Sequence, residues 1–155
     1  MQSIHDLLSA YGASHQNPVN KRVHWVCVPA IVFSLLGLLG LLWLLPVPAG
    51  LPSWLNWAGM VIALAMVYYF VLAPRLALGM ILVVVLNVAA LVALERAQLP
   101  LGYAFAATFV GAWIGQFVGH KFEGASPSFF QDVQFLLIGP LWLLAYLYRR
   151  CGWSY

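Results

Sequence analysis

The chain has 155 residues, of which 64% are hydrophobic and 7% are charged, and its net charge is +3. Soluble domains carry about a quarter charged residues, so this composition excludes an ordinary soluble enzyme, a nucleic-acid-binding protein and a disordered chain. The mean hydropathy of +0.92 agrees with that exclusion. We therefore predict an all-α membrane protein with a single membrane-embedded domain, residues 1–155.

Residues 1–24 form a comparatively polar segment ahead of the first long apolar run. The segment lacks a basic stretch followed by a short apolar core, so we expect no cleaved signal peptide. Asn17 and Pro18 are typical of a helix N-cap followed by proline in the first turn, which predicts a helix beginning at Pro18. His15 then precedes this helix on a segment that can fold back over the helix end. Asn20 and His24, four residues apart, share one face.

Residues 26–123 contain four apolar runs, each close to the roughly 20 residues that cross a bilayer as a helix. Prolines, glycines and charges separate the runs. Their lack of alternating polarity favours helices over a barrel. The predicted spans are Val26–Leu45, Trp54–Leu72, Leu76–Leu94 and Leu101–Glu123.

Residues 124–155 are predicted to form a short loop and one more helix. The apolar run Phe135–Tyr148 covers only ~20 Å as a helix and contains Pro140, which is expected to kink it. It is therefore a fifth span, a re-entrant piece or an interfacial helix. The fold class is a polytopic helix bundle of four to five spans.

Basic residues flank the spans unevenly, and an excess of Lys and Arg marks the cytoplasmic side. Lys21 and Arg22 precede the first span, Arg75 lies between the second and third, and Lys121 is near the end of the fourth. These charges predict a cytoplasmic N-terminus, and the compact chain suggests a bacterial inner membrane. The start of the first span and the end of the fourth then lie at the same membrane face.

Two polar runs at that face contain ionisable and amide side chains that a membrane-spanning helix does not require. The first contains His15 and His24, and the second contains Gln116, His120 and Glu123, spaced four and three apart on one helical stripe. A neighbouring stripe of small residues would let another helix approach closely. That stripe consists of Gly111, Gly115 and Gly119.

Imidazoles with one carboxylate and no thiolate suit a divalent first-row metal such as iron(II), zinc or manganese. Four histidines in the whole chain favour a mononuclear site over a many-histidine di-iron site. Other interpretations stay open: a non-catalytic membrane scaffold with interfacial histidines, a haem electron-transfer protein with His24 and His120 as axial ligands, and a zinc-dependent hydrolase. The nearby cations are interpreted as orientation and snorkelling charges. They are Lys21, Arg22 and Lys121.

The two polar runs also form a pair of motifs. The first is Tyr11…His15-Gln16-Asn17-Pro18-Val19-Asn20…His24-Trp25…Pro29, and the second is Gln116-Phe117-Val118-Gly119-His120…Glu123…Ser126-Pro127. Together they resemble a small multi-span membrane family, long described as a domain of unknown function, that includes the fungal 2-hydroxy fatty acid dioxygenase of phytosphingosine metabolism. The resemblance covers nearly the whole chain, including its hydrophobic layout.

The resemblance implies an iron(II)-dependent dioxygenase that uses O2 to shorten a 2-hydroxy long-chain fatty acid by one carbon. Glu123 would be a fourth ligand or a base, and Asn20 and Gln116 would be polar groups of the catalytic site. Lys21, Arg22 or Lys121 would steer the substrate carboxylate. The implied metal ligands are the three motif histidines, His15, His24 and His120. Neither the residues nor the resemblance indicates an oligomeric state.

Overall fold

The computed structural model describes residues 3–41, 56–97, 100–124 and 134–155. Within these ranges the secondary structure consists of α-helices joined by short turns, which confirms the predicted fold class. The helices are α1 (Ile4–Ala13), α2 (Pro18–Leu41), α3 (Trp57–Leu72), α4 (Pro74–Arg96), α5 (Leu101–Glu123) and α6 (Gln134–Arg150).

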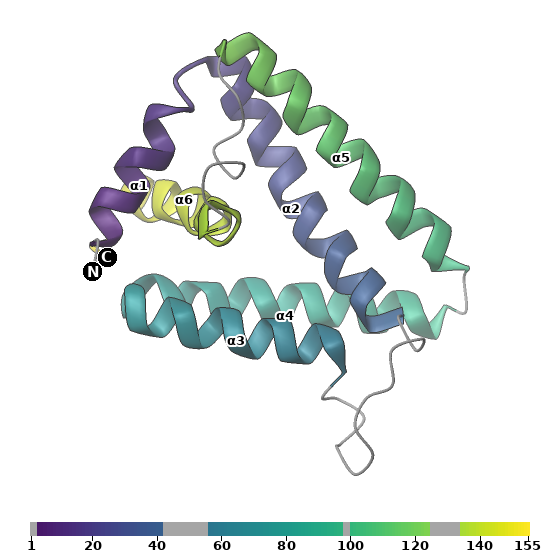
Figure 1. The fold of residues 1–155 in the computed structure, drawn as a ribbon. Helices are drawn as coiled ribbons and strands as arrows, with labels where there is room; N and C mark the ends of the chain where they lie inside the picture. Colours follow the sequence, from purple (N-terminus) through teal and green to yellow (C-terminus); the bar gives the residue numbers. More distant parts are fainter. Residues whose placement is uncertain (1–2, 42–55, 98–99, 125–133) are drawn as a thin grey trace.

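The helices form two antiparallel pairs that converge at one end and diverge at the other (Figure 1). The pair α2 and α5 has the most extensive helix–helix contact, and α3 packs on α4. At the divergent end α1 lies against α6, and α6 also contacts α2 and α4. This arrangement puts the start of α2 beside the end of α5.

Three of the described helices are long and apolar enough to cross a membrane. They are α2 over Pro18–Gly40, α4 and α5, each with 23 residues in the apolar segment. The predicted second span appears as α3, which has only 16 described residues; its expected first residue, Trp54, lies outside the described ranges. Large apolar side chains cover the outer faces of α3 and α4, as expected of a protein in lipid. Examples are Leu64, Val67, Val71, Leu82 and Leu86.

Glycines let α2 and α5 approach closely. A Cβ atom on Gly119 would lie 2.6 Å from Asn20 Oδ1 and 3.1 Å from Val23 Cγ1, and one on Gly115 would lie 2.7 Å from Cys27 Sγ. The prediction of a small-residue contact is thus confirmed at these two positions. It is wrong at Gly111, where a Cβ atom would meet nothing within 4 Å, because this part of α5 is exposed.

Helix α6 packs among other helices and is not one of the candidate spans. Ile138, Leu141 and Ala145 are fully buried, and they join the same core as Leu7 and Leu8 of α1. The Tyr69 hydroxyl of α3 donates to the Leu137 carbonyl at 2.9 Å, and the Tyr148 hydroxyl of α6 donates to the Arg75 carbonyl at 3.1 Å. Helix α6 therefore anchors α1 to the α3–α4 pair.

We expect Gly119→Ala to destabilise the protein by about 1–3 kcal/mol, because the new methyl group overpacks the α2–α5 contact. The matched control is Gly111→Ala, which should be neutral or stabilising by up to about 1 kcal/mol, since Ala is the better helix former and the space is open. Denaturant unfolding in detergent measures both. Equal effects of the two substitutions would contradict the close approach at Gly119.

Candidate metal centre

Three histidines from different parts of the chain meet at the end of the α2–α5 pair. His15 lies on the link between α1 and α2, His24 lies on α2, and His120 lies on the last turn of α5. Their side chains are almost fully buried, with 1%, 2% and 4% exposed. One ligand nitrogen of each lies within 4.8 Å of the others, a grouping that could hold a metal ion.

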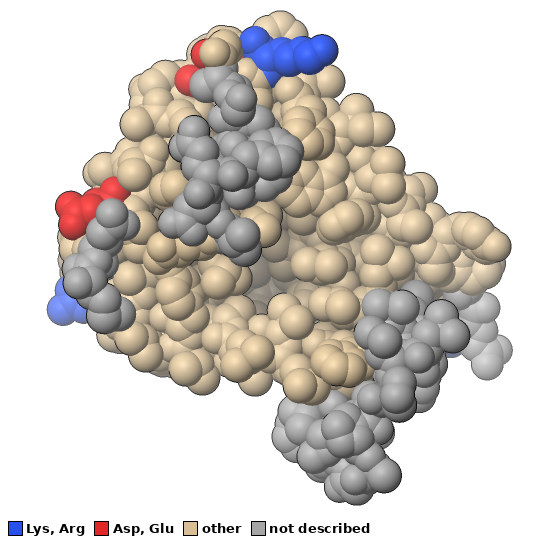
Figure 2. Space-filling view, in the orientation of Figure 1, with Lys and Arg blue, Asp and Glu red and all other residues tan. Residues whose placement is uncertain are grey.

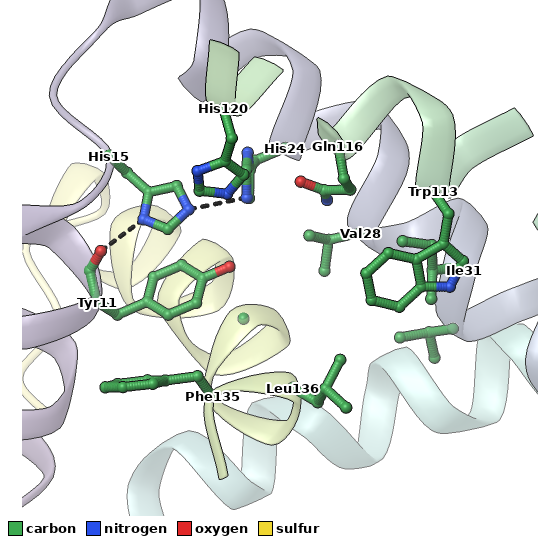
Figure 3. A pocket seen from close by; sticks show the side chains of 12 residues that line it. Tyr11, His15, His24, Val28, Ile31, Trp113, Gln116, His120, Phe135 and Leu136 are labelled. Carbon is green, nitrogen blue, oxygen red and sulfur yellow. Dashed lines mark hydrogen bonds between the residues drawn. The ribbon is translucent and has the colours of Figure 1, made fainter. Parts of the chain in front are cut away.

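Backbone carbonyls orient two of the three rings, and Figure 3 shows the contact of His15 with the Tyr11 carbonyl. The Nδ1 atom of His15 lies 2.5 Å from the Tyr11 carbonyl oxygen, and that of His24 lies 3.0 Å from the Asn20 carbonyl oxygen. The two Nε2 atoms face each other at 2.8 Å. Metal-ligating histidines typically donate their second ring nitrogen to a carbonyl in this manner, which fixes the tautomer and frees the other nitrogen.

The number of protons on the two rings determines whether these contacts suit a metal ion. A neutral imidazole carries one ring proton, so two neutral rings supply two protons for three contacts. Carbonyl oxygens only accept, so both protons belong on Nδ1. The Nε2 lone pairs of His15 and His24 then point at each other and need a cation between them. The contact is satisfied by a third proton or by a metal ion.

Burial disfavours the third proton, which would make one of the two imidazoles positively charged. It lowers the pKa of His15 to about 4 by desolvating the imidazolium form, so the ring is neutral at neutral pH. Two more polar atoms in the cluster are buried without a hydrogen-bond partner among the described residues, namely His120 Nδ1 and Gln116 Oε1. The donor set therefore fits a divalent cation.

Glu123 holds the link that carries His15. Its carboxylate accepts from the backbone N–H of Gln16 at 2.6 Å and of Asn17 at 3.0 Å, and from Asn20 Nδ2 at 3.0 Å. Helix α5 ends here because Gly124 adopts a left-handed conformation with φ of 73°. Glu123 lies outside the group of three converging ligands, so its role as a fourth ligand stays a prediction.

The predicted start of α2 is confirmed. The Asn17 side chain accepts from the Val19 N–H at 2.8 Å, and the Asn17 carbonyl accepts from the Lys21 N–H at 3.0 Å. Asn20 is fully buried between α2 and α5, where it reaches Glu123 through Nδ2 and supports His24 through its carbonyl. The first turn of α2 thus positions two of the histidines.

A cavity of about 50 Å³ opens beside the histidine cluster. Gln116 contributes to its wall, as does Tyr11, a residue of the first motif to which the sequence assigns no role. The Tyr11 ring stacks on His15 with centroids 4.2 Å apart, and its hydroxyl points into the cavity (Figure 3). A Cβ atom on Gly139 would lie 3.1 Å from this hydroxyl. The signal in the sequence is the four-residue spacing of Tyr11 and His15.

The predicted carboxylate-steering cations do not line the cavity. Arg22 and Lys121 are exposed and Lys21 is half-buried, and they lie on the beginning of α2 and the last turn of α5. Figure 2 shows that charged side chains on this face lie mainly at its edges. Their role in substrate binding stays a prediction, and Ser126 and Pro127 of the second motif lie outside the described residues.

The position of His15 argues against the haem alternative. The His24 and His120 ring centroids are 5.2 Å apart, and the His15 ring lies close to both, at 4.2 Å from His24 and 5.0 Å from His120. A porphyrin between His24 and His120 would have to displace this third ring.

Fold and site together define a helical membrane protein with a buried three-histidine cluster that could hold a metal ion. The family described as 2-hydroxy-palmitic acid dioxygenase Mpo1-like matches residues 1–151, so the chain belongs to the Mpo1-like family. This family name relates the protein to 2-hydroxy fatty acid dioxygenases and confirms the resemblance seen in the motifs. No curated protein and no solved structure matches the chain significantly.

We expect Glu123→Gln to weaken metal binding by about 10–100-fold while one ion per chain still binds at saturation, because the substitution loosens the His15 link without removing an imidazole. Calorimetric titration of the metal-free protein measures both quantities. Glu95→Gln, an exposed position at the end of α4, is the control. Complete loss of the ion in Glu123→Gln would instead identify Glu123 as a ligand.

Proposed function

We propose that the protein is an iron(II)-dependent membrane dioxygenase that shortens a 2-hydroxy long-chain fatty acid by one carbon. The observation that carries this proposal is the pair of buried, carbonyl-oriented imidazoles whose Nε2 atoms face each other 2.8 Å apart, with His120 beside them. Membership of the Mpo1-like family supports the choice of reaction. Zinc and manganese are the alternative metals for this donor set.

The overall reaction needs no co-reactant other than O2. A 2-hydroxy acid, R–CH(OH)–COOH, and one O2 give R–COOH, CO2 and water, with the C1–C2 bond broken and C2 oxidised to a carboxyl group. The four electrons released by the acid reduce O2 completely. Bound iron(II) would supply the binding and activation of O2 and of the acid's polar end.

The protein's own residues would hold and orient the reactants. His15, His24 and His120 would hold the ion, and three neighbouring protein ligands leave positions open for substrate and O2. Burial raises the pKa of Tyr11, which keeps its phenol protonated so that the hydroxyl can donate a hydrogen bond to the acid's polar end. Gln116 offers an oxygen on the cavity wall that has no hydrogen-bond partner within the described part of the chain.

The orientation of the protein in its membrane belongs to the same proposal. The basic residues around the spans favour a site near the cytoplasmic face, in a bacterial inner membrane. Lys21 and Arg22 at the beginning of α2 and Lys121 in the last turn of α5 would then attract the substrate carboxylate from that side.

The proposal predicts that purified protein binds one iron per chain and consumes O2 when given 2-hydroxy fatty acids. His24→Ala should abolish both, because it removes one of three converging ligands, whereas His5→Ala, an exposed histidine outside the cluster, should change neither. Elemental analysis and an oxygen electrode make the measurements. Absence of bound metal after iron or zinc supplementation would refute the metal centre and favour a non-catalytic scaffold.

Tyr11→Phe should keep the fold and the bound iron but lower kcat by about tenfold. This factor corresponds to the free energy of one hydrogen bond between the Tyr11 hydroxyl and the polar end of the substrate. The matched control is Tyr103→Phe, at a position that is 88% exposed. Turnover and iron content are measured on the same preparations. Unchanged turnover in Tyr11→Phe would assign Tyr11 only to the packing of His15.

A further inference from the structure

A second, much larger cavity adjoins the one at the histidines. It has a volume of about 670 Å³ and lies among α2, α3, α4 and α6, with α5 contributing two residues. Figure 2 shows a hollow at the centre of the face, in the region that α2, α3 and α6 surround in Figure 1. The lining includes residues 25–36 of α2, which correspond to ~16 Å of helix. We refer to this space as the apolar chamber.

The apolar chamber and the histidine cavity share part of their walls. Five residues line both spaces, so the end of the chamber lies at the metal centre. Figure 3 shows several of them on the side of the cavity away from His15. The shared residues are Val28, Ile31, Val32, Trp113 and Leu136.

The lining of the chamber suits a hydrocarbon. No residue with a formal charge, and no histidine, is among the described residues that form its wall. Two of its polar side chains direct their donors to backbone carbonyls: Tyr69 Oη to Leu137 at 2.9 Å and Asn87 Nδ2 to Val83 at 2.8 Å. Polar anchoring for a ligand is thus concentrated at the histidine end.

The size of the chamber suits a long chain. An aliphatic cavity of about 150 Å³ holds benzene, so a volume of about 670 Å³ has room for roughly 25 carbon atoms. A phospholipid chain would bring a bulky headgroup to the cavity of about 50 Å³, which has no room for it. A carboxylate with an adjacent hydroxyl is small enough for that position.

We propose that the apolar chamber binds the acyl chain of the substrate, with the carboxyl end at the histidines, and that side chains of α3 and α4 in its wall limit the chain length. This inference rests on the proposed function, because it assigns the chamber to the same substrate. Ala65 on α3 and Val84 on α4 are small, half-buried wall residues at which added bulk would shorten the chamber.

The test compares two pairs of matched substitutions. Ala65→Phe and Val84→Phe fill the chamber, whereas Ala63→Phe and Val85→Phe add the same ring to exposed positions on the same helices. Iron-loaded proteins in nanodiscs are assayed with 2-hydroxy acids of eight to eighteen carbons. Binding of tritiated 2-hydroxypalmitic acid is measured on the same proteins without turnover, under nitrogen.

We expect the filling substitutions to lower kcat/KM and affinity for the sixteen-carbon acid by about 10–100-fold, as overpacking does. Their activity on the eight-carbon acid should stay within about twofold of wild type, as should every activity of the two controls. The inference is overturned if the filling and control substitutions give the same chain-length profile, or if filling lowers activity equally at all lengths. A wild-type protein inactive on every acid refutes the proposed function, and the binding measurement then decides the inference alone.

Discussion

The close antiparallel packing of α2 on α5 is the contact on which the candidate site depends. Only with glycine at positions 115 and 119 can the backbone of α5 approach Cys27 and Asn20 of α2 so closely. The antiparallel direction brings the beginning of α2 to the end of α5, and with it His24 to His120. Without this contact nothing would bring His24, near the beginning of α2, to His120, at the end of α5.

The third imidazole depends on the remainder of the fold. His15 follows α1, and α1 is fixed at the start of α2 because it packs on α6. Helix α6 is in turn hydrogen-bonded to α3 through Tyr69 and to α4 through Tyr148. The same position of α6 keeps the two helix pairs apart and leaves the apolar chamber between them. One packing arrangement therefore accounts for both the polar centre and the apolar space beside it.

Much of the fold and of the candidate site could be predicted from the sequence. The signals are either local in the chain or depend only on whether the number of membrane crossings is even or odd. Asn17 and Pro18 mark the start of α2 through backbone chemistry that needs no tertiary information. An even number of predicted membrane crossings brings the histidines to one face, whatever the exact helix angles. The extreme apolarity of the chain made its few polar side chains stand out, and the three histidines do converge.

The features that could not be predicted depend on side-chain packing. A stripe of glycines gives no information on where a neighbouring helix diverges, so Gly111 was expected in a contact that the structure confines to Gly115 and Gly119, nearer the C-terminal end of α5. Tyr11 lines the cavity where Gly139 of α6, a helix far away in the sequence, leaves room for its hydroxyl. Spacing alone also could not show that Glu123 binds backbone amides of the link.

The link between α1 and α2 has a consequence for how an ion enters and leaves. Two of the proposed ligands lie on long helices packed against each other, whereas His15 lies on a four-residue link whose backbone N–H groups donate to Glu123. The proposed ion would therefore be exchanged by release of a short segment, with the paired helices left undisturbed. We expect loading to follow an order in which His24 and His120 receive the ion first and His15 closes over it.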